Sequence, residues 1–124
     1  MNESQFKAAV CKSIRKQLPG AVVFRHEDRL TAGIPDISVT WHGRTVWLEA
    51  KILDLDIFPV EHLAKKFPLQ ARTIQQLVIQ GNEKSGFLVL GPRRIAIISW
   101  RWRGMGWKIV REFDTYHKIV DWLE

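Results

Sequence analysis

The chain has 124 residues, of which 46% are hydrophobic and 26% charged, so we expect one domain over residues 1–124 with a core of its own. A single cysteine, Cys11, excludes an intrachain disulfide framework, and no window approaches the roughly 18 apolar residues of a membrane span, which predicts a soluble intracellular (cytoplasmic) protein without membrane partners. Lysine and arginine total 19 against 13 acidic residues, and this net charge of +6 suits a polyanionic partner such as nucleic acid.

The first expected element is an amphipathic helix over residues 2–18, where apolar side chains recur every four positions until Pro19. Asn2, followed three positions later by Gln5, has the pattern of a capping box. It places Glu3 in the first turn, where a negative charge favours the helix dipole.

Three strands are predicted next. The β-branched run 21–26 gives the first of them. Residues 34–41 and 45–53 give two more, and the short connection at His42-Gly43-Arg44 is typical of a β-hairpin.

The second half begins with an irregular or partly helical stretch, after which Pro68 opens a helix that ends near Gly81. The apolar run GFLVLG, residues 86–91, predicts a strand covered on both faces, parallel to a neighbour across that helix. A last hairpin precedes a helix over 115–124, which Asp114 is expected to cap. The order α-β-β-β-α-β-β-β-α predicts an α/β fold, with a central mixed sheet between helices.

Three charged residues stand out within the otherwise apolar hairpin. Alternation places Glu49 and Lys51 on one face of their strand, opposite Val46, Leu48 and Ala50. In the simplest hairpin register, Asp36 lies close to this pair. Two neighbouring carboxylates repel each other unless a cation lies between them, and Mg²⁺ takes few carboxylates and accepts phosphate oxygens. The alternative interpretation is a solvated cluster of salt bridges.

A family resemblance rests on these residues. The pattern GIPD, followed after twelve intervening residues by EAK, resembles the PD-(D/E)xK nuclease superfamily. The segment PLQARTIQQLVIQG that follows is most similar to its VRR-NUC branch and to the related Holliday-junction resolvases. The resemblance covers about residues 1–91 and implies a restriction-endonuclease-like core, with residues 92–124 as an additional hairpin and helix.

The resemblance also implies roles for individual residues. In that family an aspartate and a glutamate, which correspond to Asp36 and Glu49 here, bind Mg²⁺ or Mn²⁺. The family's lysine, which corresponds to Lys51, assists attack by water. A glutamate of the first helix often completes the metal environment, and Glu3 is its counterpart. Gln70 matches the glutamine of the helix after the core and is counted with the catalytic residues, although an ordinary exposed helix residue is the alternative.

The expected function is therefore a small endonuclease that hydrolyses phosphodiester bonds in branched or structured DNA. A homodimer is expected, because symmetric incision of a Holliday junction needs two sites related by a two-fold axis. A stand-alone domain of this size is similar to compact nucleases encoded by phages and mobile elements. Two other classes remain open: a non-catalytic DNA-binding module on the same fold, and a structural protein with a Trp-rich surface.

Basic residues outside the motif predict the DNA-binding surface. Arg101 and Arg103 lie in a segment rich in tryptophan, where cations can follow phosphates and rings can stack on unpaired bases. The same tryptophans can instead belong to the core or to a dimer interface. Lys65, Lys66 and Arg72 form a second candidate group.

Two further alternatives concern the loop that begins at residue 26. Glu27 and Asp28 are rival metal ligands, although a run of charges in a loop is more often only solvated. His26, close to the expected site, is a candidate phosphate contact.

Overall fold

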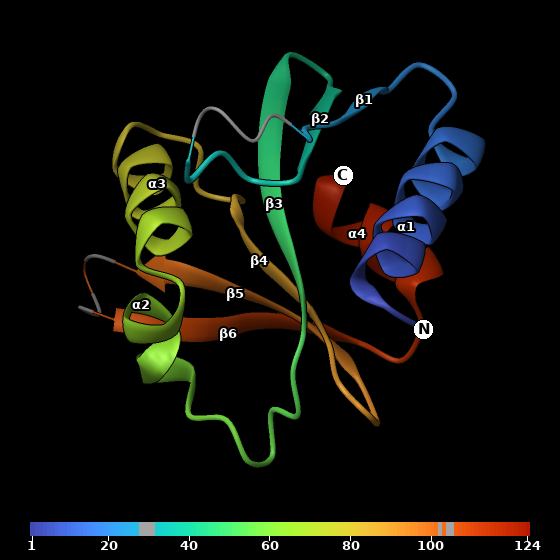
Figure 1. Ribbon diagram of the computed structural model, residues 1–124. Helices are drawn as coiled ribbons and strands as arrows, with labels where there is room; N and C mark the ends of the chain where they lie inside the picture. Colours follow the sequence, from blue (N-terminus) through green and yellow to red (C-terminus); the bar gives the residue numbers. More distant parts are fainter. Residues whose placement is uncertain (28–31, 102, 104–105) are drawn as a thin grey trace.

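The computed structural model of the protein describes residues 1–27, 32–101, 103 and 106–124. It is an α/β protein in which helices pack against both faces of a six-stranded mixed sheet (Figure 1). The strands are β1 (Val22–Arg25), β2 (Ile37–Trp41), β3 (Arg44–Ile52), β4 (Gly86–Leu90), β5 (Ile95–Arg101) and β6 (Gly106–Phe113). The helices are α1 (Glu3–Gln17), α2 (Leu63–Lys66), α3 (Pro68–Ile79) and α4 (Val120–Leu123), with 3₁₀ turns at Val60–His62 and Tyr116–Ile119. The expected element order and the α/β class are confirmed.

The strands lie in the sheet in the order in which they occur in the chain. All neighbours are antiparallel except β3 and β4, which pair in parallel, as the sequence predicts. The parallel pairing requires a crossover connection, and this connection carries α2 and α3. The hairpin and the crossover together bring residues of β2, β3 and α3 to one end of the sheet.

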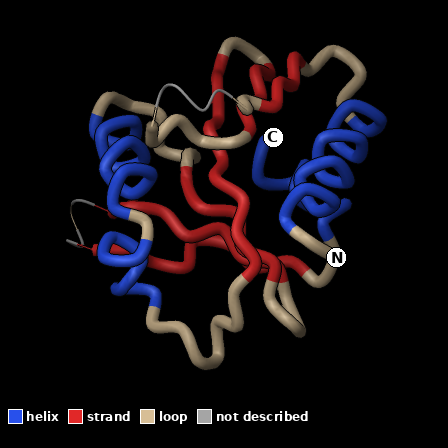
Figure 2. The backbone as a smooth tube through the Cα atoms, in the orientation of Figure 1, coloured by secondary structure: helices blue, strands red, loops and turns tan. Residues whose placement is uncertain are grey.

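Each face of the sheet has its own apolar cluster. One cluster lies under α1 and α4 and includes Phe6, Ile14, Leu48 and Ile119. The other lies under α2 and α3 on the opposite face (Figure 2). Val46, Leu48 and Ala50 of β3 all belong to the first cluster, so the predicted alternation of β3 is confirmed.

The β2–β3 connection is a tight turn. His42 and Gly43 both have positive φ, at 50° and 75°, which is the backbone of a two-residue hairpin loop. This loop fixes the register in which Ile37 lies opposite Leu48, so that Asp36, one residue earlier, comes next to Glu49.

The ends of the helices agree in part with the sequence. The capping box of Asn2 and Gln5 is present at the start of α1. At the C-terminus the prediction is wrong, because Thr115 and not Asp114 accepts the capping N–H, which comes from His117. Asp114 instead forms an ion pair with Lys118, one helical turn later, at 3.0 Å. Among the helices of the described residues, none is both long and apolar enough to cross a lipid bilayer.

Strand β1 is an edge of the sheet, paired only with β2. The N–H of His26, just after the strand, donates to the Asp36 carbonyl at 2.7 Å, so by alternation the carbonyl of Val23 points away from β2. Arg15 of α1 donates a hydrogen bond to this outward carbonyl at 2.8 Å. The free side of the edge strand is thus partly occupied by an arginine side chain.

Candidate active site

A cavity of about 620 Å³ opens where the N-terminal half of α1, the end of β1 and the start of α3 meet. Its lining is mainly polar and includes Lys7, Arg25, His26, Asp36, Glu49 and Gln70. Residues from five separate segments of the chain therefore face one space.

The loop before β2 holds Asp36 in a restrained position. Gly33 has φ of +89°, and a Cβ on it would lie 3.0 Å from the Leu69 carbonyl oxygen of α3. Only glycine adopts this backbone easily while lying so close to the helix. Pro35 then restricts Ile34 to extended conformations, so the carboxylate that follows is held by a stiff segment.

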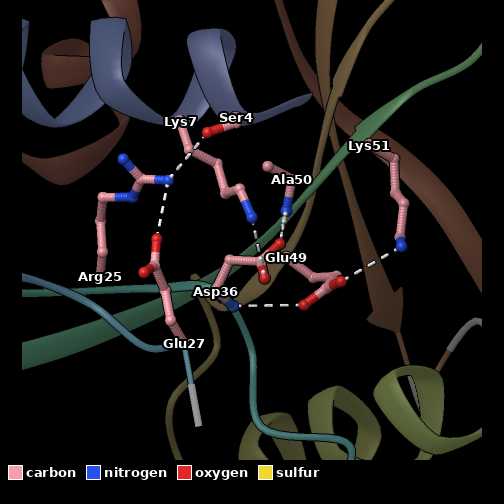
Figure 3. A network of polar contacts seen from close by, with 8 residues as sticks. All are labelled: Ser4, Lys7, Arg25, Glu27, Asp36, Glu49, Ala50 and Lys51. Carbon is pink, nitrogen blue, oxygen red and sulfur yellow. Dashed lines mark hydrogen bonds and ion pairs between the residues drawn. The ribbon is translucent and has the colours of Figure 1, made fainter. Parts of the chain in front are cut away.

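Asp36 and the strand segment Glu49-Ala50 are joined by two hydrogen bonds (Figure 3). The backbone N–H of Asp36 donates to Glu49 Oε1 at 3.2 Å, and the N–H of Ala50 donates to Asp36 Oδ2 at 3.1 Å. These reciprocal bonds fix both carboxylates relative to the two strands. The proximity of the pair predicted from the hairpin is present in the structure.

Two lysines approach the carboxylates from opposite faces of the sheet. Lys51 Nζ lies 3.3 Å from Glu49 Oε2 and stands 4.2 Å above the centre of the Phe67 ring. Lys7 of α1 places its Nζ 3.5 Å from Asp36 Oδ1. All four side chains are largely buried, so these ion pairs are screened less than surface pairs.

The electrostatics of the site centre on Glu49, whose residue is only 3% exposed. Burial, with a further contribution from the negative charge of Asp36, raises the pKa of Glu49 to about 7, although Lys51 acts in the opposite direction. A carboxyl that ordinarily ionises near 4.5 is therefore partly protonated at neutral pH.

This donor set fits a divalent cation. A cation between Asp36 and Glu49 would relieve the repulsion that raises the Glu49 pKa, and it would use oxygen ligands of the kind that Mg²⁺ and Mn²⁺ take. Mg²⁺ is commonly held by one or two carboxylates and keeps several waters, for which the open cavity has room.

The other predicted site residues are placed differently. Gln70, near the start of α3, lines the cavity. Glu3 is exposed in the first turn of α1 and is not among the lining residues. Within the described ranges, no group of three or more His, Cys, Asp or Glu side chains is arranged to hold a metal ion. The structure thus brings together two of the three predicted metal ligands, Asp36 and Glu49. The role of Glu3 stays a prediction.

The candidate DNA-binding residues lie outside this cavity. Arg101 donates to the Glu83 carbonyl at 3.2 Å and lines a second cavity with Arg103 and Trp100. Lys65, Lys66 and Arg72 are exposed on α2 and α3.

The tryptophans near the C-terminus pack against other residues in the described part of the chain. Trp107 is 8% exposed and packs edge-on against Phe87 and Trp100. Trp122 donates its indole N–H to the Lys84 carbonyl at 2.9 Å. Trp102 lies outside the described residues. The alternative that placed such rings in the core therefore holds for Trp107.

Several residues of the site were not found from the sequence. Lys7 carries no local signal, because its contact with Asp36 depends on how α1 docks on the sheet. Arg25, which lines the cavity, forms an ion pair with Glu27 at 3.0 Å. The carboxylate of Glu27, one of the two alternative metal ligands, is therefore already paired with a cation. Asp28, the other rival, lies outside the described residues.

Comparison with known proteins adds no identification. No model of a known protein family matches the chain. No curated protein matches it either.

Proposed function

We propose that the protein is a metal-dependent endodeoxyribonuclease with a restriction-endonuclease-like core. The observation that carries the proposal is the pair Asp36 and Glu49, hydrogen-bonded to each other's strands in an open cavity, with Lys51 at 3.3 Å from Glu49. The resemblance of GIPD and EAK to the PD-(D/E)xK motif supports the same assignment.

The residues of the site have distinct tasks in phosphodiester hydrolysis. Asp36 and Glu49 would hold Mg²⁺ or Mn²⁺, and the bound ion would supply Lewis-acid activation of the attacking water and of the phosphate. Lys51 orients this water beside Glu49 and stabilises the negative charge that grows on the phosphate oxygens. Lys7 and Arg25 attract the phosphate into the cavity, and Gln70 positions it from α3.

The biological setting of the proposal follows from the family resemblance. The substrate is branched or structured DNA, such as a Holliday junction, and the active form is a homodimer that brings two sites to one junction. The protein acts in the cytoplasm as one of the compact nucleases encoded by phages or mobile elements. The net charge of +6 supports a polyanionic substrate.

A cleavage assay tests the proposal. A four-way junction, a flap and a matched linear duplex are incubated with the protein in Mg²⁺, in Mn²⁺ and in a chelator. We expect cleavage only with a divalent cation, and faster cleavage of the junction than of the duplex. A protein that binds these DNAs but cuts none of them with either ion would be a binding module, and the nuclease proposal would be rejected.

The division of roles between lysine and carboxylates gives a prediction for Lys51→Ala. We expect this variant to lose cleavage by roughly 10²- to 10³-fold, the usual cost of removing one group that stabilises charge in a transition state. It should still bind Mn²⁺ in calorimetry, because an ammonium is not a metal ligand. The titration is done at about pH 8, since loss of Lys51 removes an influence that lowers the Glu49 pKa.

Lys118→Ala is the matched control. Lys118 also forms an ion pair with a carboxylate, that of Asp114, but it is exposed and is not among the residues that line the cavity. This control should cut at the wild-type rate. Loss of Mn²⁺ binding by Lys51→Ala at this pH would contradict the division of roles.

A further inference from the structure

A row of aromatic rings crosses the sheet beside the candidate active site. Phe24 of β1, His26 just after it and Trp47 of β3 stand on the same face as Glu49, because Phe24 lies opposite Ser38 and Ser38 lies opposite Trp47. The His26 and Trp47 rings are stacked, with centroids 5.0 Å apart and planes inclined by 29°. The Phe24 ring lies 6.3 Å from that of His26. We call these three residues the ring row.

The Phe24 end of the ring row is uncovered within the described part of the structure. The apolar cluster under α2 and α3 draws its strand residues from β4, β5 and β6, so these helices do not bury the corresponding face of β1 and β2. Phe24 is 57% exposed and its neighbour on the same face, Val22, is 48% exposed. His26 and Trp47 are half-buried. Phe24 and Val22 thus place two exposed apolar side chains side by side on one face of β1, and contiguous exposed apolar surface of this kind can mark a binding site.

Two rings of the row, those of His26 and Trp47, are also held in place before any partner binds. His26 Nε2 lies 2.7 Å from the Ser38 hydroxyl oxygen, and Ser38 itself is buried. This hydrogen bond and the stack on Trp47 hold the imidazole in one orientation. A flat ligand that docks here pays little entropy to order the rings.

The row leads directly into the cavity. His26 belongs to both, and its backbone N–H donates to the Asp36 carbonyl at 2.7 Å. Successive residues on one face of a strand are about 7 Å apart, which resembles the separation of the base and the phosphate in one nucleotide. The cavity supplies the cations Lys7 and Arg25 for a phosphate, and the row supplies rings for a base.

We propose that the ring row stacks an unpaired base of a DNA strand whose adjacent phosphate enters the Asp36–Glu49 cavity. The proposal rests on the proposed function and narrows its substrate class to DNA with unpaired nucleotides next to the scissile phosphate. In a continuous duplex both faces of each base are already stacked on neighbouring bases. A flap, a bulge or the open centre of a junction presents a free base face, which aromatic side chains bind irrespective of sequence.

A second copy of the chain is the other occupant that this face could take. Pairing through the edge of β1 is opposed by Arg15, which already occupies the outward carbonyl of Val23. A nucleic acid is favoured over a copy because the row is continuous with a cavity whose lining includes Lys7 and Arg25, the cations that suit the phosphates of a polyanion.

The test measures binding in a chelator, so that its outcome does not depend on cleavage. Fluorescence anisotropy compares a duplex that carries a single-stranded arm with a fully paired duplex of the same length. Phe24 is replaced in turn by Ala, Leu and Trp, and Val22→Ala is the matched control on the same face and strand. Phe24 is the best position to vary, because substitutions of a side chain this exposed change the stability of the fold little.

We expect Phe24→Ala and Phe24→Leu to weaken binding to the armed duplex at least about fivefold, the equivalent of about 1 kcal/mol of stacking on one base. Phe24→Trp should bind at least as tightly as wild type, and all variants should bind the paired duplex equally. The fluorescent base analogue aminopurine, placed in the arm, should be quenched by wild type and less by Phe24→Leu. Val22→Ala should behave as wild type in each measurement.

The result that overturns the inference is equal binding of the armed duplex by wild type, Phe24→Leu and Phe24→Ala. Light scattering tests whether a second copy of the chain occupies this face. If the wild type is a dimer and Phe24→Ala is a monomer, the face is an interface between copies. Either result leaves the nuclease proposal standing if the wild type cuts DNA. Conversely, suppose that the wild type cuts no DNA while binding to the armed duplex weakens as residue 24 changes from Trp to Phe to Leu to Ala. That result would keep the ring row as a DNA-binding site and reject catalysis.

Discussion

Replacing Asp36 by Asn is expected to lower DNA cleavage at least about 10³-fold while leaving the fold intact. A catalytic cation contributes several kcal/mol of transition-state stabilisation, and each 1.4 kcal/mol or so is a factor of ten in rate. The amide keeps the shape of the carboxylate and retains an oxygen that can accept the Ala50 N–H. It lacks the charge that attracts Mg²⁺ or Mn²⁺. Cleavage is measured on a junction at several Mg²⁺ concentrations, with thermal unfolding as the check on the fold.

The control for this variant is Asp114→Asn, which also removes a carboxylate that pairs with a lysine, at 3.0 Å. Asp114 is exposed at the far end of the chain's last strand, so its loss should leave the rate within about twofold of wild type. If Asp36→Asn cuts DNA as fast as this control, Asp36 is not a metal ligand.

Replacing Glu49 by Gln is expected to abolish cleavage and to change how stability depends on pH. The folded-state pKa of Glu49, about 7, is above its ordinary value of 4.5, so the native state binds a proton more tightly than the unfolded chain. Wild-type stability should therefore fall as pH rises from about 4.5 to about 7, by up to roughly 3 kcal/mol. Glutamine does not titrate, and the variant should lack this decline.

Urea denaturation without divalent cations measures this effect. From about pH 5 to about pH 8, the free energy of unfolding of Glu49→Gln should gain roughly 2–3 kcal/mol relative to wild type. Glu61→Gln, in an exposed 3₁₀ turn, should follow the wild-type curve. Added Mg²⁺ at about pH 8 should stabilise wild type but not Glu49→Gln. Parallel pH curves for wild type and Glu49→Gln would show that the folded-state pKa of Glu49 is not raised.

The centre of the site could be predicted from the sequence because its geometry is local. The turn at His42-Gly43 fixes the register of a single hairpin, and this register alone places Asp36 against Glu49. The alternation of β3 then puts Lys51 on the face that bears Glu49. Short-range rules of turn and strand geometry are sufficient for these contacts.

The periphery of the site could not be predicted, because it depends on how separate elements dock. The approach of Lys7 to Asp36 requires α1 to lie on the sheet, and the Phe67 ring under Lys51 requires the crossover. The ring row also combines β1 with β3, two strands that are not neighbours. The wrong prediction of Asp114 as the helix cap has a different cause. Asp114 and Thr115 are both residue types that cap helices, and Thr115 does so in the structure. The Asp114 carboxylate instead binds Lys118, one turn later.

The contact of Arg15, from helix α1, with the edge strand β1 has a consequence for solubility. The free edge of a β-strand that carries exposed apolar side chains is a template on which other chains can pair and stack as in amyloid. Here β1 has only four residues, two of them exposed apolar residues, Val22 and Phe24. Arg15 occupies a carbonyl that an incoming strand would need, and its charge is costly to bury in such a stack. The protein can therefore keep an open aromatic surface at high concentration with less risk that this surface starts a fibril.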